Sequence, residues 1–215
     1  HERTGDLPAS SIVTRRRFDR ALLQWELEHF REWGLDALVG PSGAEGRSIL
    51  DETFARIVAE IEQMPCGFVH RDYQSKNLMV SPSGALTVLD FQDALIGPRS
   101  YDLVALLCDS YVDLDLDLQE SMIDRYAALR RIPADRVHGE FWWLTLHRKL
   151  KDAGRFVFID RIRKNPDFLR WYPQSLKYVG RAATLISAMA PLYEVLAQSM
   201  PGFPDAVAEP ASRVE

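Results

Sequence analysis

The stretch GFVHRDYQSKNLMV, residues 67–80, places His70, Asp72 and Asn77 between two apolar segments. Asp72 and Asn77 lie five residues apart, so one compact loop can direct both side chains into the same pocket. His70 is expected to support this loop rather than to titrate in a reaction. The pattern His-x-Asp-x-x-x-x-Asn alone would occur by chance in roughly one chain of this length in a hundred. Its neighbours therefore decide between a functional site and a polar turn before a strand.

The sequence after this loop predicts a β-hairpin. Two apolar runs, residues 78–80 and 86–89, flank SPSG, whose composition is typical of a turn. A hairpin returns the chain to its starting point, so Asp90, directly after the second run, should lie near Asn77. The apolar flanks of the loop and the Asp-Phe pair after the hairpin favour a kinase-type site over a polar turn.

These residues match the needs of phosphoryl transfer to a hydroxyl group. The acceptor must be oriented, its proton must be accepted, and cations must stabilise the charge on the transferred group. Asp72 is the candidate base, which would orient the hydroxyl and take its proton. Asn77 and Asp90 offer an amide oxygen and a carboxylate, which are suitable ligands for magnesium when phosphates complete its coordination.

Composition excludes several other classes of protein. The 215 residues carry a net charge of −5, which argues against a nucleic-acid partner. No apolar run reaches membrane-spanning length and no secretory signal is visible, so no membrane partner is expected. Cys66 and Cys108 lie in apolar surroundings and are predicted to be buried reduced thiols. Such cysteines are typical of a reducing compartment, so a cytoplasmic location is expected.

Most of the remaining sequence has helical periodicity. Residues 1–14 show no clear period and are predicted to be a tail or linker, and residues 201–215 carry three prolines and are predicted to be a C-terminal tail. Between them, residues 15–200 are predicted to form one mostly helical domain. Its helices are expected from Arg15 to Gly34, after Ser48, after Ser100, after Asp117, from Pro133, and over residues 167–186 and 192–200.

The motifs resemble a known family. HRDYQSKN followed by LDFQDALIGPRSYDLVAL is similar to the aminoglycoside phosphotransferase/choline kinase-like family, which shares the protein-kinase fold. LDFQDALIGPRSYDL, DSYVDL and HRKLKDAGRF most resemble its sugar kinases that phosphorylate the anomeric hydroxyl of N-acetylmuramate and N-acetylglucosamine in cell-wall recycling. The resemblance covers about residues 15–200. It implies ATP and Mg²⁺ as cofactors, Asp72 as the catalytic base, and Asn77 and Asp90 as magnesium ligands.

The resemblance also implies roles for two further carboxylates. Asp102, within GPRSYDL, would brace the catalytic loop by accepting hydrogen bonds from backbone N–H groups. The alternative is an ordinary acidic residue in the first turn of a helix, where the helix dipole favours negative charge. Asp93 would support the metal site or face the metal, and the equal alternative is a solvent-exposed residue of a loop. The kinase Asp-Phe-Gly is Asp90-Phe91-Gln92 here.

The front half of such a kinase is not visible in the sequence. The family has an N-terminal lobe with a phosphate-covering loop and a strand lysine paired with a helix glutamate. GPSGAEG, residues 40–46, lies between two predicted helices and is interpreted as a linker. We therefore expect a C-terminal lobe only, mainly α with a small β-hairpin, of a protein-kinase-like α+β fold. Alone it is expected to be inactive, and its lobe-facing side is expected to allow self-association.

The acceptor is predicted to be a small-molecule sugar. Arg148, Lys151 and Arg155 share one helix face that could bind a carboxylated sugar such as N-acetylmuramate, or could be a solvated basic face. VDLDLDL, residues 112–118, offers three carboxylates to an aminoglycoside, although alternation with leucine is also typical of a surface strand or a helix start. The alternatives are an aminoglycoside or amino-alcohol kinase, and a non-catalytic lobe that binds a sugar or a partner.

Overall fold

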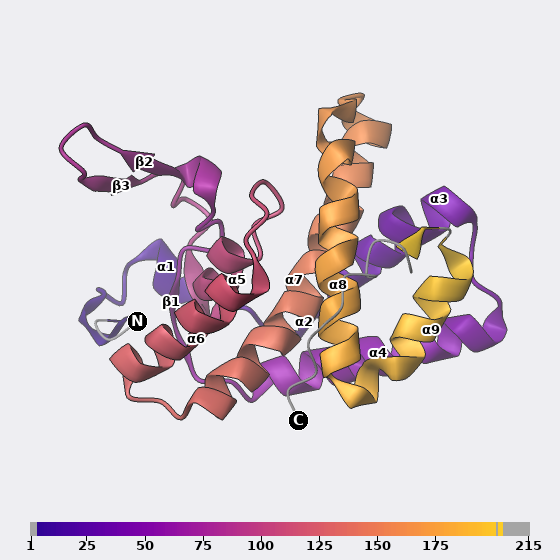
Figure 1. Ribbon diagram of the computed structural model, residues 1–215, viewed down its shortest axis with the longest axis horizontal. Coiled ribbons are helices and arrows are strands. Elements are labelled where there is room, and N and C mark those ends of the chain that lie inside the picture. The colour runs from indigo at the N-terminus through magenta and orange to yellow at the C-terminus, as the bar shows by residue number, and fades with distance from the viewer. Residues whose placement is uncertain (1–3, 201, 204–215) are drawn as a thin grey trace. The chain divides into compact units, whose positions relative to one another are not determined.

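The computed structural model describes residues 4–200 and 202–203, and this part of the chain is mainly helical (Figure 1). The predicted C-terminal tail, residues 201–215, lies outside the described residues apart from Gly202 and Phe203. In chain order the α-helices and strands are α1 (Ile12–Arg15), α2 (Arg20–His29), α3 (Ala37–Val39), α4 (Ala44–Glu62), β1 (Cys66–Val69), β2 (Leu78–Val80), β3 (Leu86–Val88), β4 (Leu95–Pro98), α5 (Tyr101–Leu107), α6 (Leu116–Arg130), α7 (Ala134–Arg163), α8 (Tyr172–Leu185) and α9 (Ala190–Ser199). Short 3-10 helices cover Thr4–Asp6, Ser75–Asn77, Pro166–Trp171 and Ser187–Met189, and Phe30–Asp36 is a π-helix.

The chain divides into two compact units, each of which is built from two segments. The first unit comprises His1–Arg20 and Glu60–Leu144, and the second comprises Ala21–Ala59 and Thr145–Glu215. Helices α4 and α7 continue from one unit into the other. All four strands belong to the first unit, and α8 and α9 belong to the second. Within the described residues, no helix is both long enough and apolar enough to cross a membrane.

The predicted hairpin is confirmed, and a second strand pair accompanies it. Strands β2 and β3 pair antiparallel, with Leu78 opposite Val88, and project away from the helices of their unit (Figure 1). Strands β1 and β4 form a separate antiparallel pair with Val69 opposite Leu95. The prediction of a single hairpin missed this pair, because Gly97-Pro98 in β4 has the composition of a turn. The catalytic loop lies between β1 and β2.

The segment before α2 also contacts this second strand pair. Phe18 donates its N–H to the carbonyl of Ile96 at 2.9 Å, and Ile96 donates to the carbonyl of Arg16 at 2.9 Å. Thr4 accepts a hydrogen bond from the N–H of Phe68 at 2.8 Å. Thr4, within the stretch predicted to be a tail, therefore forms a hydrogen bond with β1, and the proposed domain boundaries stay a prediction.

The second unit begins with a helix that starts and ends later than predicted. The sequence predicted a helix from Arg15 to Gly34, but α2 begins only at Arg20, because Arg16 and Phe18 bind Ile96 of β4, and the π-helix carries the chain past Gly34 into α3. Tyr172 donates its hydroxyl to the carbonyl of Gly34 at 2.7 Å and so satisfies a carbonyl of the π-helix. Burial raises the pKa of this phenol, which keeps it protonated as a donor.

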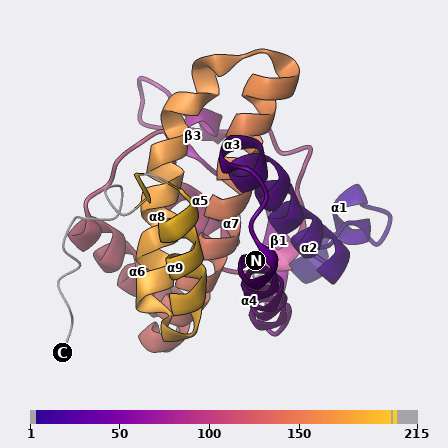
Figure 2. The ribbon, with the colours of Figure 1, turned by 90° about the vertical axis from the view of Figure 1, so that its right-hand side faces the viewer.

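Two helix starts differ from the prediction. Helix α4 begins at Ala44, ahead of the predicted cap at Ser48. Helix α6 is capped by Asp115, which accepts from the N–H of Leu118 at 2.7 Å, and not by Asp117. Helix α4 buries one apolar face, as its helical periodicity predicts, and this face comprises Leu50, Phe54, Ile57, Val58 and Ile61. Helices α8 and α9 lie side by side (Figure 2) and bury residues that include Leu176, Val179, Leu192 and Leu196.

Gly154 of α7 permits a close helix contact within the second unit. A Cβ atom at this position would lie 2.7 Å from the Cα of Phe30 and 2.9 Å from the carbonyl oxygen of His29. Both neighbours are backbone atoms, so the helices would have to move apart. We expect Gly154→Ala to lower the free energy of unfolding by about 1–3 kcal/mol, as overpacking does.

Thermal unfolding followed by circular dichroism measures this effect, and α7 offers a matched control. A Cβ at Gly139 meets no atom within 4 Å. Gly139→Ala should therefore leave stability unchanged or raise it by about 0.5–1 kcal/mol, because alanine favours the helix. A Gly154→Ala variant that unfolds at the wild-type temperature would contradict the close contact.

Candidate active site

Asp102, in the first turn of α5, holds the beginning of the catalytic loop. Its two carboxylate oxygens accept hydrogen bonds from the N–H of His70 at 2.7 Å and the N–H of Arg71 at 2.9 Å. Arg71 has a φ of 75°, a conformation that is unfavourable for a bulky residue. Two charge-assisted hydrogen bonds to consecutive N–H groups hold the backbone in this shape. The bracing geometry expected of Asp102 is present, and its functional importance stays a prediction.

Asn77 connects the loop to the end of the hairpin. Its Nδ2 donates to the carbonyl oxygen of Asp72 at 2.8 Å and lies 3.4 Å from Oδ2 of Asp90. The structure thus brings Asp72, Asn77 and Asp90 together, as the hairpin argument predicted. Asp90 has a φ of 67°, and its Oδ1 accepts from Nε2 of Gln92 at 2.6 Å. Gln92 therefore orients Asp90, a contact that the sequence did not indicate.

The pair formed by Asn77 and Asp90 fits a magnesium ion that phosphates share. Magnesium prefers oxygen ligands and is usually held by one or two protein groups together with substrate phosphates. Because the nitrogen of Asn77 is engaged by a carbonyl, its Oδ1 is the atom that can bind a cation. Among residues 4–200 and 202–203, no group of three His, Cys, Asp or Glu residues forms a complete metal cage. Asn77 and Asp90 together offer an amide oxygen and a carboxylate, and phosphates would supply further ligands.

His70, directly after β1 at the start of the catalytic loop, has a buried side chain. Its ring packs edge-on against Tyr73 with the ring centroids 5.9 Å apart. Neither ring nitrogen has a hydrogen-bond partner within the described part of the chain. The backbone N–H of His70, by contrast, is bound by Asp102. These contacts agree with a supporting role for His70, which stays a prediction.

Asp93 forms an ion pair with Arg16, the second of three consecutive arginines at residues 15–17. Nη2 of Arg16 lies 3.1 Å from Oδ1 of Asp93, and Nη1 donates to the carbonyl of Gln92 at 3.0 Å. Both side chains are partly exposed, so the pair contributes little to stability. Its effect is to connect residues 92–93, just after Asp90, to the chain near α1. This places Asp93 beside the site, whereas any role toward a metal stays a prediction.

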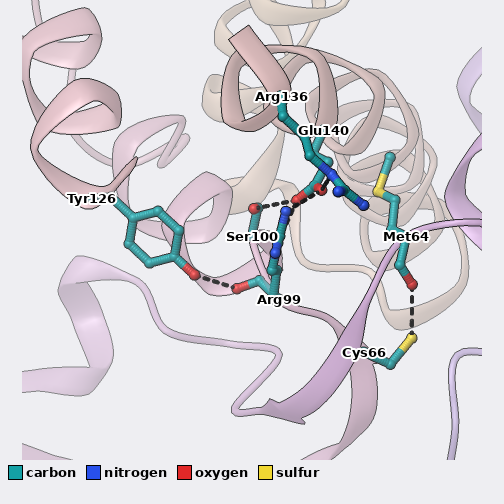
Figure 3. A network of polar contacts seen from close by, with 7 residues as sticks. All are labelled: Met64, Cys66, Arg99, Ser100, Tyr126, Arg136 and Glu140. Carbon is teal, nitrogen blue, oxygen red and sulfur yellow. Dashed lines mark hydrogen bonds and ion pairs between the residues drawn. The ribbon is translucent and has the colours of Figure 1, made fainter. Parts of the chain in front are cut away.

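A polar network anchors the start of α5, the helix that carries Asp102 (Figure 3). The carboxylate of Glu140 accepts from Arg99 at 2.6 and 3.0 Å and from the hydroxyl of Ser100 at 3.0 Å. Tyr126 donates to the carbonyl of Arg99 at 3.0 Å, and burial raises the pKa of this phenol so that it remains a donor. Arg136 adds an exposed contact to Glu140 at 3.4 Å.

The two cysteines differ from each other. Cys66, at the start of β1, is exposed and donates to the carbonyl of Met64 at 3.4 Å (Figure 3). The prediction of two buried thiols is therefore wrong for Cys66, because β1 begins at the surface and only its residues Gly67 and Val69 are buried. Cys108 is buried as predicted, and the two cysteines form no disulfide with each other.

The predicted basic face belongs to the second unit, whereas the catalytic loop belongs to the first. Arg148 is only 1% exposed, and its Nε lies 3.8 Å from Asp152, while Lys151 lies 3.1 Å from the same carboxylate. Burial alone would raise the pKa of Asp152, but the charges of Lys151, Lys149 and Arg148 outweigh it and hold that pKa far below its ordinary value. The guanidinium of Arg155 lies over the ring of Phe158.

These contacts change the interpretation of that helix face. Arg148 is not part of a solvated basic face, because it is buried against an acid. Arg148, Lys149 and Lys151 all lie within 4 Å of the carboxylate of Asp152. Trp142, on the same helix, is buried. Binding of substrate by Arg148, Lys151 and Arg155 stays a prediction.

One buried carboxylate near the loop was missed altogether. Asp109 follows α5 and accepts a hydrogen bond from the N–H of Ser75 at 2.7 Å. The only available signal was an acid placed directly after the apolar run of a helix, in LLCDSY. That signal is weak because most such acids are solvated.

The chain is similar to known phosphotransferases. The model of the family described as "Phosphotransferase enzyme family" matches residues 5–142. Three curated relatives are named N-acetylmuramate/N-acetylglucosamine kinase. The relative from Neisseria meningitidis is 31% identical over 84% of this chain and 56% of its own length, that from Pseudomonas aeruginosa is 33% identical over 84% and 55%, and that from Pseudomonas putida is 28% identical over 86% and 57%. The chain thus spans little more than half the length of these relatives.

Proposed function

The chain belongs to the phosphotransferase enzyme family, and from this premise we propose that it acts as an ATP-dependent kinase that phosphorylates a hydroxyl group of an amino sugar. The observation that carries the proposal is the position of Asn77, which contacts both the carbonyl of Asp72 and the carboxylate of Asp90. A base and a metal ligand pair are the parts that phosphoryl transfer needs side by side. The predicted family membership is confirmed by the family match.

In the proposed mechanism the residues of the chain orient the reactants. The carboxylate of Asp72 binds the acceptor hydroxyl and accepts its proton as the phosphoryl group is transferred. Asn77 and Asp90 would hold magnesium, which when bound neutralises the charge of the ATP phosphates. The hydrogen bond from Asn77 to the carbonyl of Asp72 keeps base and ligand at a fixed separation. Asp102 fixes the backbone that carries the base.

The proposed acceptors are N-acetylmuramate and N-acetylglucosamine, phosphorylated at the anomeric hydroxyl as a step of cell-wall recycling. The names of the three relatives support these sugars. The positively charged side chains of Arg148, Lys151 and Arg155 on α7 support binding of a carboxylated sugar, for which they are the candidate contacts. The VDLDLDL stretch gives less support to an aminoglycoside, because Asp115 is used as the cap of α6.

We propose further that residues 15–200 correspond to the C-terminal lobe of a kinase, cytoplasmic and inactive alone. The chain spans 56% and 55% of the length of two relatives, and a single lobe would account for a share of this size. The β2–β3 hairpin exposes Met79, Val80 and Leu86, and Phe91 is exposed just after it; a further lobe, or a second copy of the chain, would cover these apolar side chains.

A substrate comparison on the full-length gene product tests the proposed function. With MgATP we expect turnover of N-acetylmuramate and N-acetylglucosamine and little turnover of kanamycin-type compounds. Phosphorylation at the anomeric position removes the reducing end, so reducing-sugar reactivity should disappear as ADP forms. Turnover confined to aminoglycosides would refute the sugar assignment, and a phosphorylated product that still reduces would refute the anomeric one.

A further inference from the structure

We propose that Asp109 is a positioning residue for the catalytic loop, which fixes the end of the loop as Asp102 fixes its beginning. The inference rests on the proposed kinase function for its catalytic consequence. Asp109 lies just beyond the end of α5, at Leu107, and is only 2% exposed. A carboxylate buried to this degree requires hydrogen-bond donors, and the identity of those donors indicates what it holds in place.

One oxygen of Asp109 serves its own turn, and the other reaches the catalytic loop. Oδ1 accepts from the N–H of Tyr111, two residues further on, at 2.9 Å. This is the local contact that an aspartate makes in many turns. Oδ2 accepts from the N–H of Ser75 at 2.7 Å, across 34 residues of sequence. The short distance of this second bond is typical of a charge-assisted bond. Unlike the bond to Tyr111, it connects two segments that are distant in the sequence.

A second contact between the same two segments supports the assignment. The ammonium group of Lys76 lies 3.6 Å from the centre of the Tyr111 ring. A cation this close to the face of an aromatic ring is attracted by it. Residues 109–111 therefore hold Ser75 through its backbone and Lys76 through its side chain. These two residues directly precede Asn77, whose position matters for both Asp72 and Asp90.

Two carboxylates, one in the first turn of α5 and one just after its last turn, therefore hold the two ends of the catalytic loop. Asp102 binds the N–H groups of His70 and Arg71, and Asp109 binds that of Ser75. The candidate base, Asp72, lies between these two attachment points. Because misplacement of a reacting group by about 1 Å can cost on the order of 10²-fold in rate, the second attachment should matter for turnover.

Asp109→Asn tests the proposal, with Asp115→Asn as its matched control. Asparagine replaces one carboxylate oxygen by an NH₂ group and removes the negative charge, so the bond to Ser75 is either lost or deprived of its charge assistance. We expect kcat of the full-length protein to fall about 10- to 100-fold while KM for the sugar stays within about twofold. Asp115 also accepts a 2.7 Å backbone bond, but at the cap of α6, where asparagine serves equally well, so this control should keep wild-type kcat.

A readout that does not depend on activity separates the two proposals. In the ¹⁵N-labelled protein, hydrogen exchange of the Ser75 amide should accelerate at least about tenfold in Asp109→Asn and stay unchanged in Asp115→Asn. Unaltered exchange, or wild-type kcat in Asp109→Asn, would overturn the positioning role. A wild-type protein without any kinase activity would instead refute the proposed function and leave the exchange result decisive for the contact.

Ser75→Pro removes the same bond from the other side, should Asp109→Asn fail to fold. Ser75 opens the 3-10 helix Ser75–Asn77, a position that suits proline, and Gln74 before it is extended with φ −127° and ψ 164°, as a residue before proline must be. We expect kcat to fall as in Asp109→Asn, and the double variant to lose no more than the larger single loss. Fully multiplicative losses in the double variant would contradict a shared bond.

Discussion

Asp72→Asn should lower kcat by about 10²- to 10⁴-fold, the usual contribution of general acid–base catalysis. Asparagine matches aspartate in size but cannot accept the proton of the acceptor hydroxyl. The backbone carbonyl of Asp72, which binds Asn77, is retained in the variant. The loss should therefore appear in turnover, whereas the melting temperature and the affinity for MgATP measured by calorimetry should stay close to wild type.

The matched control for this variant is Asp135→Asn, an exposed acid in the first turn of α7. It removes the same charge from the same unit and should leave kcat unchanged. Near wild-type turnover in Asp72→Asn would show that another group accepts the proton. An equal loss in both variants would point to a general effect of charge.

Glu140→Ala should cause the largest loss of stability among the variants considered. Its carboxylate is the partner of Arg99 and Ser100, and the side chains of Glu140 and Arg99 are only 8% and 15% exposed. Removing one member of a buried ion pair leaves the other charge without compensation, which costs about 3–5 kcal/mol. For a chain of this size each kcal/mol lowers the melting temperature by about 2–4 °C. Calorimetry or urea unfolding measures the loss.

Arg136→Ala is the control for Glu140→Ala, because it removes a contact to the same carboxylate from the solvent side. Arg136 is 57% exposed and lies 3.4 Å from Glu140. An exposed ion pair contributes at most about 1 kcal/mol, so this variant should unfold close to wild type. A loss below about 1 kcal/mol in Glu140→Ala would contradict the buried pair.

The features that the sequence predicted correctly depend on local patterns. Asp90 lies near Asn77 because a short antiparallel hairpin brings its two ends together. The buried face of α4 follows from helical periodicity. Tertiary contacts determine the features that were missed. Asp109 meets Ser75 only after the chain folds, and β1 finds β4 across the whole catalytic loop and hairpin.

Helix ends and buried charges were also beyond local reasoning. Glycine commonly ends a helix, yet the helical chain continues past Gly34. Its missing side chain permits close packing against Gly154, and Tyr172 binds its carbonyl. Arg148 has the sequence of a surface cation, yet Asp152 compensates its charge inside the second unit. Tyr172 lies far from Gly34 in the sequence, where periodicity carries no information, whereas Asp152 is the i,i+4 neighbour of Arg148, so periodicity indicates this pair but not its burial.

The positive φ of Arg71 means that the catalytic loop has an unfavourable backbone conformation, which contacts outside the loop must hold in place. A residue held in this region costs about 1–3 kcal/mol, which the hydrogen bonds that Asp102 accepts from His70 and Arg71 must offset. The segment HRDYQSKN is therefore not a transferable module: grafted into another protein, or studied as a peptide, it would relax to a different backbone and present its aspartate elsewhere. The chemistry that the motif suggests belongs jointly to the loop and to α5, so a search for such sites by motif alone will also find chains that cannot hold the geometry.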